Sequence, residues 1–193
     1  MNLHPLTVLL TLSLLLNAYL ALELANRSGP VTEMSDQAPT EAQAPTPEEA
    51  PFASGESFPF MRVVDGDTVV VGVNSRSEYV RLIGIDSPEP HDPSGPECYA
   101  NEATEHLKEL TRTGLVVLRP DPSQGTRDTY GRLLAYVELP DGTDLGEAML
   151  RDGYAREFTY DQPYARRDAY IAAENEALET QSGLWSPETC AVE

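Results

Sequence analysis

The chain has 193 residues, enough for one domain plus additional segments. It carries 32 Asp and Glu against 13 Lys and Arg, a net charge of −19, and Lys108 is its one lysine. This balance excludes nucleic-acid binding through a broad basic surface. An acid excess combined with almost no lysine favours a halophilic protein over an ordinary acidic surface, because concentrated salt screens the repulsion between like charges.

Two N-terminal segments precede the predicted domain. Residues 6–22 form an apolar segment without a charged side chain. Its length is at the lower limit for a membrane-spanning helix and above that of most signal-peptide cores. We therefore expect residues 1–25 to be a signal peptide or a membrane anchor. Residues 26–57 are rich in Pro, Ala, Glu, Thr and Ser, and such a composition buries too little apolar surface to fold. This segment is predicted to be a disordered linker.

The remaining residues, 58–193, are predicted to be one domain that is rich in strands first and in helices later. Short runs rich in Val, Ile and Leu predict five strands. Helical spacing, the Asp144 cap and glycine stops predict three helices. The expected strands are 60–64, 68–73, 79–85, 115–118 and 133–139, and the expected helices are 98–113, 144–153 and 164–180. This order fits a small closed barrel, the OB type among others.

Acidic residues and one arginine follow the first strands. Asp67 belongs to an Asp-Gly-Asp-Thr run that suits either a hard-cation site or a common turn. Arg81 lies within a strand, and its charge requires either an anion or a path to water. The period of two predicts that it shares its face with Tyr79, Ile83 and Ile85. Asp86 and Glu89 then follow in a loop stiffened by proline.

Further along the chain, Arg132 precedes a strand and presents a planar fork that matches phosphate oxygens. Four aromatic residues between positions 154 and 164 can stack on bases or fill the core. They are Tyr154, Phe158, Tyr160 and Tyr164. Cys98 and Cys190 are expected to pair in an oxidising compartment, with two separate buried thiols as the alternative.

Three sequence motifs resemble those of the staphylococcal nuclease (thermonuclease) family. They are DGDT at 65–68, RLIGIDSPE at 81–89 and DTYGRLLAYV at 128–137, in the same order and with similar spacing. The similarity extends over 58–187. It implies a five-stranded OB-fold barrel with three α-helices.

The resemblance also implies the site residues. Asp67 and Asp86 would bind Ca²⁺ through their carboxylates and Ser87 through its backbone carbonyl. Arg81 and Arg132 would hold the phosphate, and Glu89 would be the general base or would position the attacking water. Tyr130 would contact a substrate phosphate. Tyr160 or Phe158 is a candidate for base stacking, and Thr129 stands where the family prototype has a phosphate-binding lysine.

The function implied is calcium-dependent hydrolysis of phosphodiester bonds in DNA or RNA, with little sequence specificity and with 3′-phosphate products. The protein would be a monomer, either secreted or tethered by residues 6–22 to the outer face of the cell membrane. Two alternatives are a noncatalytic nucleic-acid-binding OB-fold module and a calcium-dependent surface domain. The intact set of acids and arginines argues against both.

Overall fold

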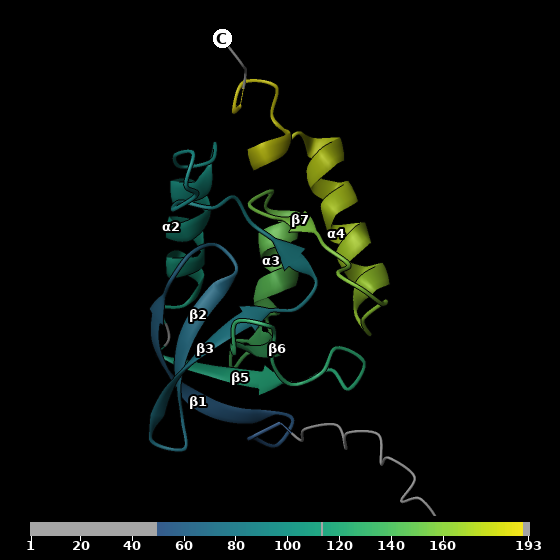
Figure 1. Ribbon diagram of the computed structural model, residues 1–193. Helices are drawn as coiled ribbons and strands as arrows, with labels where there is room; N and C mark the ends of the chain where they lie inside the picture. Colours follow the sequence, from purple (N-terminus) through teal and green to yellow (C-terminus); the bar gives the residue numbers. More distant parts are fainter. Residues whose placement is uncertain (1–49, 113, 191–193) are drawn as a thin grey trace, which may run out of the picture. The chain divides into compact units, whose positions relative to one another are not determined.

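A closed five-stranded barrel is the centre of the computed structural model, which describes residues 50–112 and 114–190 (Figure 1). The strand order around the barrel is β1-β2-β3-β6-β5. The neighbouring strands are antiparallel, except that β3 and β6 run parallel. These strands are β1 (Glu56–Val63), β2 (Thr68–Val73), β3 (Arg76–Leu82), β5 (Leu115–Arg119) and β6 (Leu133–Glu138).

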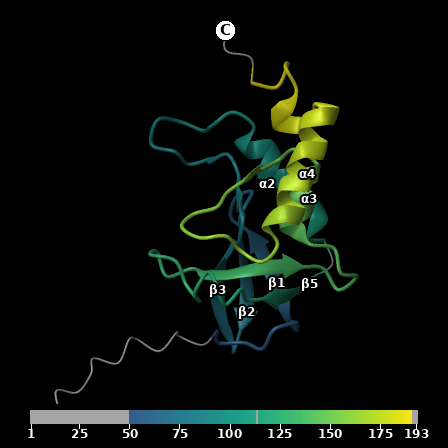
Figure 2. The same ribbon diagram turned by 90° about the vertical axis from the view of Figure 1, so that its right-hand side faces the viewer.

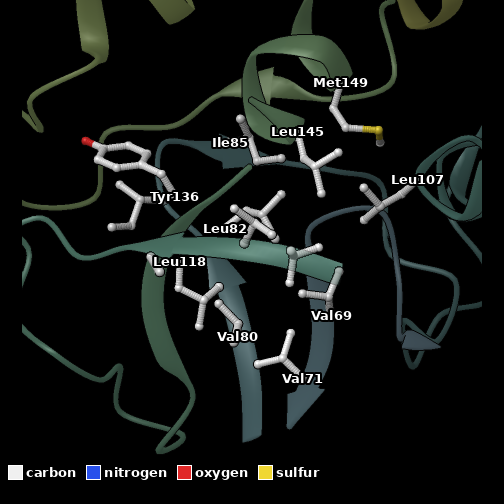
Figure 3. Close-up of a cluster of buried hydrophobic side chains, with 14 of the residues drawn as sticks. Val69, Val71, Val80, Leu82, Ile85, Leu107, Leu118, Tyr136, Leu145 and Met149 are labelled. Carbon is white, nitrogen blue, oxygen red and sulfur yellow. The ribbon is translucent and has the colours of Figure 1, made fainter. Parts of the chain in front are cut away.

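Aliphatic side chains fill the barrel, because alternate residues of each strand point inward. In β3, Val80 and Leu82 are buried, whereas Tyr79 is exposed and Arg81 is only partly covered. Figure 3 shows the inward-facing side chains of the strands meeting Leu107, Leu145 and Met149 from the helices. The outward face of β3 therefore carries side chains that solvent or a ligand can reach.

Three helices lie at one end of the barrel (Figures 1 and 2). They are α2 (Ala100–Leu110), α3 (Leu145–Arg151) and α4 (Arg167–Thr180), and α3 contacts both of the others. The Asp144 carboxylate caps α3 by accepting hydrogen bonds from the backbone N–H groups of Gly146 and Glu147, at 2.9 and 3.2 Å. The predicted helix start at Asp144 and the predicted barrel with three helices are both confirmed.

A separate two-stranded sheet pairs β4 (Ile85–Asp86) with β7 (Arg156–Glu157). The single strand predicted over 79–85 is wrong in this respect, because β3 ends at Leu82. Gly84 turns the backbone there with φ +83°, and a Cβ at this position would lie 2.5 Å from the Tyr164 ring. The turn buries Ile83 and Ile85 and takes them off the face of Arg81 on which the sequence placed them.

The C-terminal segment returns to the beginning of α2. After α4 the short 3₁₀ helix η1 (Gly183–Trp185) follows, anchored by a 2.8 Å hydrogen bond from the Leu184 N–H to the Gly153 carbonyl. A disulfide then joins Cys190 to Cys98, with the Cα atoms 5.9 Å apart. The expected pairing of the two cysteines is confirmed.

The folded region begins earlier than the predicted boundary at residue 58. Strand β1 starts at Glu56, and Phe52 is buried with its ring centroid 5.7 Å from that of Phe58. One isolated aromatic residue therefore ties the end of the predicted linker to the core. In the described part of the chain, no helix has both the length and the apolarity to cross a membrane. Residues 6–22 and most of the predicted linker lie outside it.

Candidate active site

The Arg81 guanidinium lies between two of the predicted metal-binding carboxylates. Its Nε atom is 3.0 Å from Asp67 Oδ1, and one terminal nitrogen is 3.1 Å from Asp86 Oδ1. The other terminal nitrogen donates to the backbone carbonyls of Leu82 and Ile85, at 2.9 and 2.7 Å. The turn at Gly84 brings these acceptors together, so the strand end itself fixes the arginine's orientation.

Asp67 is the buried member of this group, with 1% of its surface exposed. Its Oδ2 atom accepts hydrogen bonds from the Ser87 N–H at 3.0 Å and from the Ser87 hydroxyl at 3.4 Å. Gly66 permits this close approach, because a Cβ there would lie 2.6 Å from the Ser87 hydroxyl and 2.9 Å from the Ala103 side chain. The first two motifs therefore meet through Asp67 and Ser87.

Arg132 reaches the same group through Thr68. Its Nε atom donates to Asp128 Oδ2 at 2.6 Å, and one terminal nitrogen donates to the Thr68 hydroxyl at 3.2 Å. That hydroxyl in turn donates to Asp67 Oδ1 at 2.9 Å. Arg132 and Arg81 are thus linked to the same carboxylate, which brings the third motif to the other two.

Glu89 lies in the loop after β4, and its backbone is held by Glu97. The Glu89 N–H donates to Glu97 Oε2 at 2.9 Å, and the Glu97 N–H donates to the Glu89 carbonyl at 3.0 Å. The Glu89 carboxylate interacts electrostatically with both Asp67 and Arg132. Glu89 itself is exposed.

Burial and mutual repulsion raise the pKa of three carboxylates in the site. Partial burial raises the pKa of Glu89, and the charge of Asp67 raises it further. Partial burial also raises the pKa of Asp86, although Arg81 opposes the shift. For Asp65, burial and then the charge of Asp67 raise the pKa to about 6. This crowding of acids is the setting in which a cation would be stabilised.

The donor set suits a hard cation, because every candidate donor is an oxygen. Asp67, Asp86 and the backbone carbonyl of Ser87 would hold it. In residues 50–112 and 114–190, no three Asp, Glu, His or Cys side chains gather into a metal-binding cluster. An ion bound here would therefore complete its shell with water or substrate oxygens.

A pocket of about 420 Å³ adjoins the arginines. Its lining includes Arg81, Arg132 and three exposed aromatic residues, Tyr130, Phe158 and Tyr160. The four aromatics grouped in the sequence thus separate in the structure: Phe158 and Tyr160 face the pocket.

The other two aromatic residues of that group have structural contacts. Tyr164 is buried, and Tyr154 stacks between Tyr99 and His106, with ring centroids 5.1 and 4.0 Å away. They are therefore not available to a ligand in the pocket.

Sequence reasoning assigned no role to three residues that organise the site. Asp128 holds Arg132, Thr68 connects Arg132 to Asp67, and Glu97 holds the Glu89 loop. Asp128 and Thr68 lie within the quoted motifs, so their position was a usable signal. Nothing in the sequence indicated the role of Glu97, because its partner Glu89 is eight residues away in an irregular loop.

The sequence is similar to a family model and to several named nucleases. A family model described as staphylococcal nuclease homologue matches residues 79–187, a range that contains Arg81, Glu89 and Arg132. Endonuclease YncB of Bacillus subtilis (strain 168) is 32% identical over 157 residues, covering 80% of this chain and 74% of that protein. The thermonuclease of Staphylococcus hyicus is 32% identical over 136 residues, covering 69% and 78%. That of Staphylococcus intermedius is 35% identical over 132 residues, covering 68% and 77%.

Proposed function

This chain belongs to the staphylococcal nuclease homologue family, and from that premise we propose that it is a calcium-dependent nuclease. It would hydrolyse phosphodiester bonds of DNA or RNA with little sequence specificity and leave 3′-phosphates. One observation carries the proposal: Arg81 lies between Asp67 and Asp86 at the edge of a pocket that Arg132 also lines.

Calcium is the proposed cofactor, held by Asp67, Asp86 and the Ser87 carbonyl. When bound, it would act as a Lewis acid that polarises a phosphoryl oxygen and orients the substrate. The charges support this assignment. Asp67, Asp86 and Glu89 outnumber Arg81 and Arg132 by one negative charge, so the metal-free site repels a phosphodiester. A divalent cation and one phosphodiester together add one positive charge, which balances these five side chains. Asp65 and Asp128 lie beside them and add negative charge, which further favours a bound cation.

Arg81 and Arg132 bind the scissile phosphate in this proposal. Each guanidinium is already oriented by hydrogen bonds to the protein, and the N–H groups that these bonds leave over lie in its plane and can meet phosphate oxygens. They neutralise the charge that develops on these oxygens as water attacks phosphorus. Because both are fixed before substrate binds, little reorganisation is needed in the transition state.

Glu89 is the proposed general base. It accepts a proton from the attacking water as the new P–O bond forms and the bond to the 5′ oxygen breaks. The leaving oxygen takes a proton from solvent, so the products are a 3′-phosphate and a 5′-hydroxyl. The raised pKa of Glu89 brings its basicity closer to the value that proton abstraction needs near neutral pH.

The exposed aromatic residues Tyr130, Phe158 and Tyr160 are the proposed contacts to the nucleotide. Phe158 and Tyr160 would stack on an unpaired base, and Tyr130 would contact a phosphate. Stacking tolerates every base, which is the reason for expecting little sequence specificity and a preference for single strands.

An extracellular location and adaptation to high salt are part of the proposal. The Cys98–Cys190 disulfide supports a location outside the cytosol, where thiols are not kept reduced. The apolar segment 6–22 would direct export or act as a membrane anchor. In concentrated salt the acidic surface would repel nucleic acid less, and binding would rest on the site itself. A monomer suffices, since the described residues form a complete candidate site.

Degradation of single-stranded DNA by the full-length chain tests the proposal. The assay compares calcium, magnesium and chelator, in dilute buffer and in about 1 M salt. Calcium-dependent cutting that leaves 3′-phosphates is expected, and Arg132→Ala should lower the rate by at least about 100-fold. Arg112→Ala is the control and should leave the rate unchanged, because Arg112 is exposed just after the end of α2 and pairs with Glu109 rather than with a residue of the site. Binding without cutting would overturn the proposal in favour of a noncatalytic module.

A further inference from the structure

Arg156 lies next to the candidate site but outside the pocket. Strand β7 places Arg156 directly opposite Asp86 in the antiparallel register of the small sheet. Paired residues of an antiparallel ladder project to the same face, with Cβ atoms about 5 Å apart. The positive charge of Arg156 acts on Asp86 from the strand opposite, while Arg81 contacts Asp86 directly.

Arg156 also differs from the two arginines of the site in its partners. Arg81 and Arg132 each form ion pairs with carboxylates. Within residues 50–112 and 114–190, Arg156 forms no ion pair, although acids are in large excess in this chain. Its guanidinium stacks on the Trp185 ring, 4.8 Å from the centroid. Stacking holds the guanidinium plane while leaving its N–H edge free to donate to an anion.

Trp185 is itself held from two sides. The 3₁₀ helix that carries it is anchored to Gly153 by the Leu184 N–H, and the chain after it ends in the disulfide to Cys98. The backbone that carries the ring is therefore anchored on both sides. An arginine fixed in this way loses little freedom when it binds an anion.

The position of Arg156 relative to the pocket indicates which anion it takes. Phe158, two residues further along the chain, faces the pocket, whereas neither Arg156 nor Asp86 lines it. Arg81 lines the pocket and contacts Asp86, and Asp86 pairs with Arg156, so Arg156 lies on the side of Arg81 that faces β7. A strand that has its scissile phosphate at Arg81 and extends toward β7 would pass Arg156. The next charged group it presents there is the neighbouring backbone phosphate.

We propose that Arg156, supported by Trp185, is a second phosphate-binding site, which takes the backbone phosphate next to the scissile one on a single strand. This rests on the proposed nuclease function and deepens it, because it predicts a preference for substrates with at least two phosphodiesters. Arg156 is a substrate-binding residue here and takes no part in bond breaking.

Arg156→Gln tests the proposal with two substrates, a single-stranded oligothymidine of about ten nucleotides and a dinucleoside monophosphate with one phosphodiester. The KM for the oligonucleotide should rise about tenfold, since a charge-assisted hydrogen bond to phosphate is lost. The kcat for both substrates, and the KM for the dinucleoside monophosphate, should stay the same. The slope of log KM against log salt should fall by about 0.7, the value for one phosphate contact on a single strand.

Arg112→Gln is the matched control, because it removes the same charge from an exposed position just after the end of α2 and should change neither KM nor the slope. Trp185→Phe keeps an aromatic ring under Arg156, so its KM for the oligonucleotide should stay close to that of the wild type. An unchanged KM in Arg156→Gln, or an equal rise for both substrates, would overturn the second site.

Anisotropy with a phosphorothioate single strand in calcium gives a readout that needs no turnover. Arg156→Gln should weaken this binding by the same factor of about ten. Failure of the wild type to cut would refute the nuclease function, whereas equal binding by variant and wild type would refute the phosphate site alone.

Discussion

Removing the Cys98–Cys190 disulfide should destabilise the protein strongly. The bond closes a segment with a sequence separation of 92 residues. For a loop of that length, the chain-entropy relation gives about 4.6 kcal/mol of stabilisation through the unfolded state. A domain of this size loses about 2 to 4 °C of Tm per kcal/mol, so Cys98→Ser/Cys190→Ser should melt roughly 10 to 18 °C below the wild type.

Thermal and urea unfolding of both proteins, with and without a dithiol reductant, measure this effect. Reductant should lower the stability of the wild type to that of the double variant and leave the double variant unchanged. A loss below about 1 kcal/mol would refute the reasoning, because it would mean that the unfolded chain gains little freedom when the bond is removed. A further drop of the double variant in reductant would show that the reagent acts elsewhere.

Three other changes have outcomes that follow from the fold. Gly84→Ala should cost about 2 to 4 kcal/mol in urea unfolding, because alanine disfavours φ +83° and its Cβ would press on the Tyr164 ring; a neutral result would contradict the tight turn. Burial opposes ionisation of Asp121, but hydrogen bonds from the Ala165 N–H and the Tyr136 hydroxyl, among others, outweigh it and lower its pKa. The ionised Asp121 therefore stabilises the folded state fully above pH 3.8, and this stabilisation is lost as the pH falls through the pKa of Asp121 in the folded protein. The difference in unfolding free energy between wild type and Tyr136→Phe should shrink below about pH 4 for this reason. Raising salt from dilute buffer to about 2 M should raise the Tm, because it screens a net charge of −19; a flat or falling Tm would contradict salt adaptation.

The site depends on how the barrel ends as much as on the residues it carries. Arg81 continues the outward face of β3, but the turn at Gly84 directs the chain back so that the Ile85 carbonyl and Asp86 meet its guanidinium. Had β3 run on to residue 85, Asp86 would have lain further along the strand. The same turn frees β4 to pair with β7, which brings Arg156 to Asp86.

The sequence by itself determined the local elements and the chemistry of the motifs. The run of valines at 68–73 predicted β2 with the bounds observed, because a buried strand is read from its own apolar residues. Asp144 predicted the start of α3, because a cap acts on backbone groups two and three residues away. The motifs named Asp67, Arg81, Asp86 and Arg132, which the structure brings together.

Tertiary structure alone decided the long-range pairings. The parallel register of β3 with β6, the burial of Phe52, and the exposure of Phe158 and Tyr160 rather than Tyr164 each depend on partners distant in the chain. Local patterns show which side chains prefer burial, but several aromatic residues of equal hydrophobicity compete for the same core. Only the closed barrel and its helices decide which of them are covered, and therefore which remain free to meet a ligand.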